Sequence, residues 1–283
     1  MGNLGRRPFI ASEALAAGIV KKHQLRREFL GLLPDVYVDA DVELTLELRA
    51  TAVWLWSHRQ GVIAGLTAAG LHGAKWVDDP LPIELIWSNA RRPPGVRVFD
   101  LRLAADELTA RGLMRVTTPA RTAFDIGRRG RLDHAVARLD ALGNATRFAA
   151  DDVVALAARH RGARGLRQLP TALELYDPGA ASPKETWLRL LLIRAGFPRP
   201  QSQIPAVGVS GRQYYLDMGW EDLMVAVEYD GDQHRLDRRQ FVKDILRLEE
   251  LRDLGWIVVR VVAENNESEI IDRVHRARES RLR

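Results

Sequence analysis

The sequence predicts an α/β fold, because segments with helical periodicity alternate with short strand-like runs along most of the chain. Hydrophobic residues make up 46% of the 283 residues and charged residues 28%, as in ordinary folded proteins. The segment from Tyr176 to Pro183 is rich in turn-forming residues and interrupts a helical pattern, so it is the best domain boundary. At this length we expect two ordinary cores in preference to one large core.

The first segment, residues 1–60, predicts two short helices followed by a strand. Ser12 to Ala17 and Lys21 to Leu30 have helical patterns, and Val36 to Val38 is strand-like. This order is the outline of a winged helix-turn-helix, whose second helix enters the DNA major groove while the wing touches the backbone. A basic helix with a solvated face would give the same pattern. The candidate DNA contacts on this helix are Lys21, Lys22, Arg26 and Arg27.

The middle segment, residues 61–177, predicts a mixture of helices and strands. Thr118 suits the N-cap of a helix and Pro119 its first position. The helices expected across this segment and just before it cover residues 43–58, 62–72, 132–143, 149–160 and 165–176. The strands expected are Ile83 to Trp87 and Val96 to Leu101.

The last segment, residues 178–283, predicts a helix, three strands, a helix, a strand and a terminal helix. The expected strands are about 199–206, 213–220, 223–230 and 256–262. The two later helices are expected at about 237–254 and 267–281.

Acidic residues follow the most apolar of these strands. Leu223 to Val227 is apolar on both faces, as in a central strand, and period-two geometry then places Glu228 and Asp230 on one side. Burying unpaired acids costs several kcal/mol each, and a bound cation relieves that cost. An acidic edge strand facing solvent is the alternative, which the continuous apolar run before Glu228 argues against.

The preceding strand supplies a third acid, Asp217, on the same side as Tyr215. A tight turn near Glu221 and Asp222 would make an antiparallel hairpin and place Asp217 beside Glu228. Three oxygen ligands, Asp217, Glu228 and Asp230, suit Mg²⁺ or Mn²⁺.

Four further residues are candidates with competing interpretations. Glu185 fits a capping box with Ser182, yet it shares a helical face with Leu188 and Leu192 that points toward the core. His234 lies four residues after Asp230 and is a candidate general base or phosphate contact. A lone histidine in a loop usually has neither role. Two cations at the start of the long helix face either the site or solvent: Arg238 and Lys243.

Composition narrows the function classes. The formal net charge is +5, and only five of the 42 basic residues are Lys. Arginine suits contacts to DNA phosphates and bases, although a GC-rich genome would give the same bias. The absence of Cys excludes disulfides, thiolate nucleophiles and iron–sulfur clusters. No signal peptide is evident and no run of about 18 apolar residues occurs, so we expect no membrane span and, by elimination, a cytoplasmic protein.

The C-terminal motifs resemble the PD-(D/E)XK nuclease superfamily, and most closely its branch related to very-short-patch (Vsr) repair endonucleases. The matching residues are Ser182-Pro183-x-Glu185, Asp217-x-Gly219-Trp220, Val227-Glu228-Tyr229-Asp230-Gly231-x-x-His234, Lys243-Asp244, Leu254-Gly255-Trp256 and Val259-Arg260-Val261. The resemblance implies a restriction-endonuclease-like α/β core with a mixed sheet, and Mg²⁺-dependent cleavage of phosphodiesters with the ion on Asp217 and Glu228. Asp230 stands where the family usually has lysine, so Lys243, Arg238 or His234 would have to replace that charge, unless Asp230 is an additional ligand.

Residues 9–170 resemble the AbiEi family of antitoxins from type IV toxin–antitoxin systems. The matching stretches are Ala14 to Ile19, Gly31 to Val38, Ala68-Ala69-x-Leu71-His72-Gly73 and Thr117-Thr118-Pro119-Ala120-Arg121-Thr122-x-x-Asp125. The resemblance implies a DNA-binding winged helix, an α/β regulatory region and a toxin protein as a candidate partner. No chemistry follows from Thr118, Arg121 or Asp125, which we interpret as structural.

Two functions fit these observations. The first is a metal-dependent DNA endonuclease with an N-terminal DNA-targeting domain. The second is a catalytically inactive, antitoxin-like transcriptional regulator that only binds DNA. A gathered set of acids favours the enzyme, because acids repel phosphate and serve no purpose in binding alone.

Overall fold

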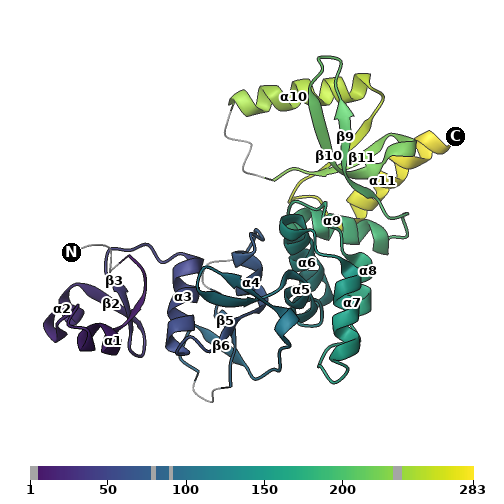
Figure 1. The fold of residues 1–283 in the computed structure, drawn as a ribbon. Coiled ribbons are helices and arrows are strands. Elements are labelled where there is room, and N and C mark those ends of the chain that lie inside the picture. The colour runs from purple at the N-terminus through teal and green to yellow at the C-terminus, as the bar shows by residue number, and fades with distance from the viewer. Residues whose placement is uncertain (1–5, 78–80, 89–91, 232–237) are drawn as a thin grey trace.

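The computed structural model describes residues 6–77, 81–88, 92–231 and 238–283. In these ranges the strands form three separate sheets of three, five and four strands, in three successive units along the chain (Figure 1). The five-stranded and four-stranded sheets both combine parallel and antiparallel pairs. The α/β class predicted from the sequence is therefore confirmed.

The N-terminal unit holds two helices against a small antiparallel sheet of order β1-β3-β2. Its elements are β1 (Phe9–Ile10), α1 (Ala11–Ala16), α2 (Lys22–Arg27), β2 (Phe29–Leu33) and β3 (Val36–Asp39). The expected helix from Lys21 to Leu30 was wrong at its end, because Phe29 and Leu30 pair with β3. The edge-to-face contact of Phe9 with Phe29, at 5.1 Å between ring centroids, fixes this pairing against α1 and α2.

The middle unit combines a mixed sheet of order β6-β5-β4-β8-β7 with a layer of helices. Its first elements are α3 (Leu46–Trp56), β4 (Val62–Ile63), α4 (Gly65–Leu71), β5 (Ile83–Ile86), β6 (Val96–Phe99), η1 (Ala105–Glu107), β7 (Leu108–Arg111) and β8 (Met114–Thr117). Its later helices are α5 (Pro119–Gly127), α6 (Leu132–Thr146), α7 (Ala150–Arg159) and α8 (Leu169–Leu175). Thr118 caps α5 as predicted, accepting from the Arg121 amide at 3.3 Å. The expected helix over 62–72 was wrong at its start, where β4 pairs with β5 and β8.

The C-terminal unit follows the predicted order of elements closely. They are α9 (Pro183–Arg194), β9 (Gln201–Val207), β10 (Gln213–Trp220), η2 (Glu221–Leu223), β11 (Val225–Tyr229), α10 (Arg238–Asp253), β12 (Ile257–Val261) and α11 (Glu267–Leu282). The sheet order is β12-β11-β10-β9, with β11 parallel to β12 and antiparallel to β10. The mixed sheet and the internal position of β11 are therefore as expected.

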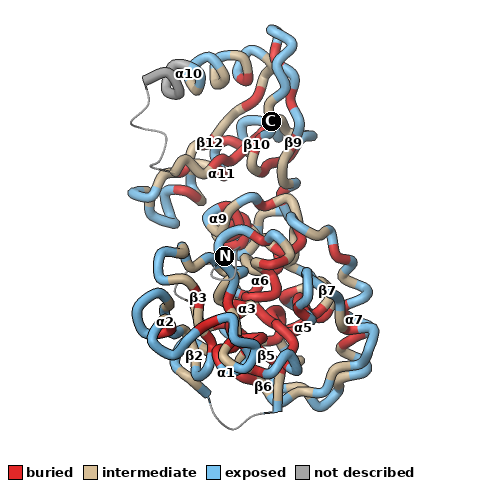
Figure 2. The backbone as a smooth tube through the Cα atoms, turned by 60° about the vertical axis from the view of Figure 1, so that its left-hand side comes forward, coloured by how far each residue is buried: buried red, intermediate tan, exposed pale blue. Residues whose placement is uncertain are grey.

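Helices cover both faces of the C-terminal sheet. Helices α9 and α11 pack on Met218, Val227 and Val259, whereas the end of α10 packs through Leu251 on Leu216 and Ala226. In the views of Figures 1 and 2, α10 lies apart from α9, and the described part of α10 is mainly exposed or half-buried. The long helix therefore covers the sheet mainly through its C-terminal half.

A buried ion pair joins the middle and C-terminal units. The Asp140 carboxylate of α6 accepts from Thr186 Oγ1 at 2.7 Å and from Arg189 Nη2 at 2.6 Å, both on α9. It also accepts from the Asp177 amide at 2.7 Å, in the segment predicted as the domain boundary. Arg189 and Asp140 are almost fully buried. Through these hydrogen bonds the first residues of the boundary segment are fixed to α6, and α9, which follows the segment, is fixed to the same carboxylate.

Two strands approach each other closely at Gly219, where β10 meets β11. A Cβ atom at this position would lie 2.2 Å from the Val225 carbonyl oxygen and 2.9 Å from the Ala226 Cα. Because both atoms belong to backbone, we expect Gly219→Ala to lower the free energy of unfolding by roughly 1–3 kcal/mol through strain in the hairpin. Chemical denaturation would measure it, with Gly162→Ala as a control, because a Cβ there meets open space and the backbone is not left-handed. An equal or smaller loss than the control would contradict the close-approach argument.

None of the helices within the described ranges combines the length and the apolar character needed to cross a membrane.

Candidate active site at the ends of strands β10 and β11

The hairpin of β10 and β11 places Asp217 beside Glu228, as the sequence predicted. Met218 pairs with Val227, so the next position along the register brings Asp217 opposite Glu228. The ladder stops there, because the Tyr229 amide donates to Asp217 Oδ2 at 3.0 Å. A cavity of about 300 Å³ opens at this point, and its lining residues are Asp217, Glu228, Tyr229, Asp230, Asp244, Arg247, Leu248 and Arg260.

The strand changes its facing at Asp217, which strict alternation does not anticipate. Leu216 packs with the α10 side of the sheet, but Met218 packs with the α9 and α11 side. The pairing of β10 with β9 passes over Asp217, and Gln203 at the matching position of β9 has a left-handed backbone with φ of 54°. Such irregularities re-aim side chains and are frequent next to active sites. Here the irregularity leaves Asp217 within electrostatic reach of both α9 and β11.

The electrostatics of Asp217 are unusual for an aspartate. Burial, followed by the negative charges of Glu185 and Glu228, raises its pKa to about 7. The hydrogen bond from the Tyr229 amide and the charge of Arg247 oppose this shift without cancelling it. Burial also raises the pKa of Glu185. In the absence of a cation, Asp217 therefore retains a proton over much of the neutral range.

Two arginines that the sequence analysis did not assign to the site neutralise the other acids. Arg247 of α10 donates to both oxygens of Glu228, from Nη1 at 2.9 Å and from Nη2, and also to the Tyr215 carbonyl at 3.1 Å. Arg260 of β12 pairs with Asp230. Helical spacing offered a signal for Arg247, since it lies one turn after Lys243. Arg260 was visible only as part of the resemblance, without a role.

Glu185 interacts with the start of α9 and also affects the electrostatics of the site. Its carboxylate accepts from the Ala181 amide at 2.8 Å and from Ser182 Oγ at 2.9 Å, and its own amide donates to Ser182 Oγ at 3.2 Å. The Ser182 N-cap is thus confirmed, but the capping box is incomplete, because the Glu185 carboxylate accepts from the Ala181 amide and not from the Ser182 amide. Its charge nevertheless raises the pKa of Asp217, so the same carboxylate contributes to the electrostatics of the site.

Of the remaining candidates, Lys243 is exposed and does not line the cavity. His234 lies outside the described residues, and so does the side chain of Arg238. In the N-terminal unit the four candidate DNA contacts are all exposed on or beside α2: Lys21, Lys22, Arg26 and Arg27.

The carboxylates at the cavity form an incomplete donor set for a divalent cation. Within the described ranges, no group of three or more Asp, Glu or His side chains is arranged to hold a metal ion. Asp230 is engaged by Arg260, which leaves Asp217 and Glu228 as the pair of predicted ligands that face each other. A carboxylate has about four acceptor positions, so Glu228 retains acceptor positions while bound to Arg247. Carboxylate oxygens are the donors that Mg²⁺ and Mn²⁺ take, and Mg²⁺ is commonly held by one or two carboxylates with water and substrate phosphate completing its shell.

Comparisons with known proteins give relatives of similar length. No family model matches the chain. The uncharacterized proteins MT2308 and Rv2248, from two strains of Mycobacterium tuberculosis, are each 28% identical over 230 residues, which cover 81% of this chain and 84% of theirs. The crystal structure of the RV2827C protein from Mycobacterium tuberculosis aligns with 16% identity and a TM-score of 0.41, over 59% of this chain and 71% of that chain. The chain is therefore similar to mycobacterial proteins over most of its length.

Proposed function

We propose that the protein is a metal-dependent DNA endonuclease. The observation that carries this proposal is the placement of Asp217, half-buried and near two further carboxylates, with a pKa raised to about 7. Repulsion among buried acids is costly to a protein that only folds and binds, and a divalent ion would remove it. Asp217 and Glu228 would hold the ion, which when bound supplies activation of water and stabilisation of the leaving oxygen. The C-terminal unit would then be the restriction-endonuclease-like domain that the resemblance implies.

Arg260 is our candidate for the positive charge that lysine supplies in the family. Asp230 occupies the lysine position, and its carboxylate anchors the Arg260 guanidinium at the wall of the cavity. Arginine keeps its charge at every relevant pH and suits phosphate oxygens. In this proposal Asp230 is a positioning residue, and Arg260 contacts the phosphodiester.

The N-terminal unit would bring the catalytic unit to DNA as a winged helix. Helices α1 and α2 followed by the β2–β3 hairpin match that design, with α2 as the groove-binding helix and the hairpin as the wing. The exposed basic residues of α2 support this role.

A nicking assay tests the proposal. We expect purified protein to convert supercoiled plasmid into nicked or linear DNA with Mg²⁺ or Mn²⁺, and not with EDTA. Glu228→Gln should reduce the rate at least a hundredfold, because it removes a charged ligand. Asp222→Asn, in the same hairpin but exposed, is the matched control and should cut normally. Metal-independent cutting, or full activity of Glu228→Gln, would remove the active-site assignment.

A DNA-binding regulator without nuclease activity is the second candidate. The observation in its favour is that arginines already neutralise Glu228 and Asp230, so these acids need no cation for charge balance. This candidate predicts that EDTA leaves DNA binding unchanged and that no cutting occurs with any metal. Binding should weaken steeply with salt under either candidate, since phosphate contacts release counterions.

A further inference from the structure

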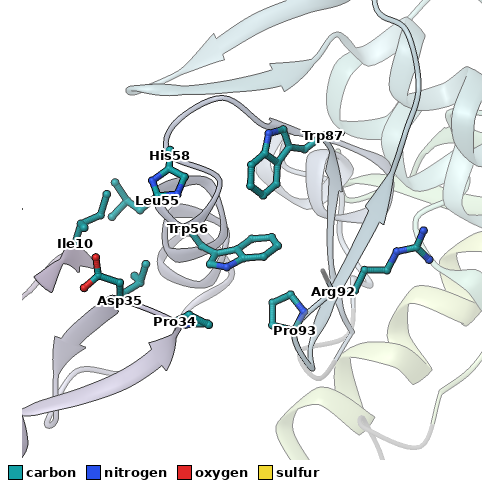
Figure 3. Close-up of a pocket in the computed structure, with 10 residues that line it drawn as sticks. Ile10, Pro34, Asp35, Leu55, Trp56, His58, Trp87, Arg92 and Pro93 are labelled. Atoms are coloured by element: carbon teal, nitrogen blue, oxygen red, sulfur yellow. The ribbon is translucent and has the colours of Figure 1, made fainter. Parts of the chain in front are cut away.

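A second cavity, of about 630 Å³, lies between the N-terminal unit and the start of the middle unit. The turn of the β2–β3 hairpin, Pro34 and Asp35, forms one side of it. Trp56 at the end of α3, Trp87 after β5 and Pro93 before β6 form the other side (Figure 3). Cavities of this volume at a junction between units commonly take small planar ligands or parts of larger ones.

The two tryptophans give this cavity its chemistry. Their rings are perpendicular, at 86° with centroids 5.1 Å apart, so the edge of one meets the face of the other. Both rings are only half-buried, in contrast to the neighbouring Trp54, which is 7% exposed. Figure 3 shows the Trp56 indole between Pro34 of the hairpin turn and Pro93, with the Trp87 indole above it. Accessible aromatic faces are the surfaces on which nucleobases stack.

The walls of the cavity are fixed without any ligand. Both carboxylate oxygens of Asp35 are bound to Ser12 of α1, one by its amide at 3.0 Å and the other by its hydroxyl. Arg59 donates to both carboxylate oxygens of Glu13 at 2.7 and 2.6 Å, which ties α1 to the segment after α3. His58 and Arg59 are consecutive left-handed residues, with φ of 53° and 64°. Strained backbone of this kind persists where the surrounding structure enforces it, often at ligand sites.

We infer that this cavity binds one unpaired nucleobase of a DNA strand held by the β2–β3 hairpin. This inference rests on the proposed DNA function, and it specifies DNA with an unpaired base as the preferred ligand. The hairpin that would touch the DNA backbone as a wing is also one wall of the cavity, so a displaced base would reach the tryptophans directly. Asp35 is already engaged, and the exposed Arg92 at the opposite side (Figure 3) has no ion-pair partner among the described residues. The Arg92 guanidinium points away from the two tryptophans in Figure 3, so it suits a phosphate outside the cavity and not the base itself.

Three DNA probes distinguish base capture from backbone binding. They are a fully paired duplex, the same duplex with one extra unpaired thymidine in one strand, and the same duplex with an extra abasic residue at that position. The thymidine and abasic probes have equal length and charge and differ only in the base. Binding is measured by fluorescence anisotropy in EDTA, so cutting plays no part. We expect the unpaired thymidine to bind about tenfold or more tighter than the abasic probe, as base–aromatic stacking permits.

Variants of Trp87 complete the test. Trp87→Leu keeps an apolar side chain without an aromatic face and should bring the thymidine probe to the abasic level, whereas Trp87→Phe should restore most of the preference. Trp76→Leu, an exposed tryptophan outside this cavity, is the matched control. Melting temperatures confirm that each variant is folded. Equal binding of thymidine and abasic probes by the unmodified protein would overturn this inference alone. Failure to bind any probe would overturn the proposed DNA function as well.

Discussion

Replacing Asp217 with asparagine is expected to abolish metal-dependent cleavage and to stabilise the metal-free protein at the same time. The pKa of Asp217 is raised to about 7 from an ordinary value of 3.8, through burial and then the charges of Glu185 and Glu228. Between these values the folded protein holds a proton that the unfolded chain has lost. The free energy of unfolding therefore falls as pH rises from about 4 to 7, and asparagine removes this loss.

The size of the effect follows from the shift. The full shift would be worth about 4 kcal/mol at 1.36 kcal/mol per pK unit, and solvent screening of a half-buried group reduces the expected gain to roughly 2 kcal/mol. Chemical denaturation in EDTA should show Asp217→Asn more stable than the unmodified protein at pH 8, with the two converging near pH 4. Added Mg²⁺ should stabilise only the unmodified protein. A variant that is less stable at pH 8 would contradict the electrostatic account of the site.

Removing Arg121 should cause the largest loss of stability. This side chain of α5 is buried and pairs with two acids that are themselves buried, Glu107 and Asp125, with Nε 2.9 Å from the Asp125 carboxylate. Arg121→Leu leaves both carboxylates without their shared guanidinium, which costs roughly 3–5 kcal/mol for a buried pair. Arg128 and His160 still contact these acids, so the lower part of that range is expected.

Denaturation followed by circular dichroism would measure this loss. The matched control is Arg131→Leu, since Arg131 is exposed at the start of α6, and it should change the free energy of unfolding by less than about 0.5 kcal/mol. A loss below 1 kcal/mol for Arg121→Leu would mean that the network around Asp125 is not an essential part of the core.

The sequence predicted the C-terminal unit best, for physical reasons. Its helices are long and periodic and have clear ends, such as the Ser182 cap and the left-handed Gly255. The short strands β7 and β8 were missed, because four-residue strands with exposed polar positions carry little periodic signal. The sequence predicts helix for Phe29 and Leu30, the first two residues of β2, because they directly continue the pattern of α2.

The site was predictable where it depends on neighbouring residues and not where it depends on distant ones. Period-two geometry and a tight turn were enough to place Asp217 beside Glu228. The change of facing at Asp217 was not predictable, because it coincides with the left-handed backbone of Gln203 on another strand. The pairing of Arg247 with Glu228 likewise depends on how α10 packs across the sheet. Arg121 and Asp125, taken as structural from the sequence, lie in a buried ionic network.

The contacts at the start of α9 determine whether the C-terminal unit can be studied as a separate fragment. Both oxygens of Glu185 are held by Ala181 and Ser182, in the segment that connects the middle unit to the C-terminal unit. A fragment beginning at Pro183 would lack both partners, so the Glu185 carboxylate would be free to move toward or away from Asp217 and would change the pKa of that residue. The C-terminal unit is therefore not an independent module, since the pKa of Asp217 is set partly by the connecting segment.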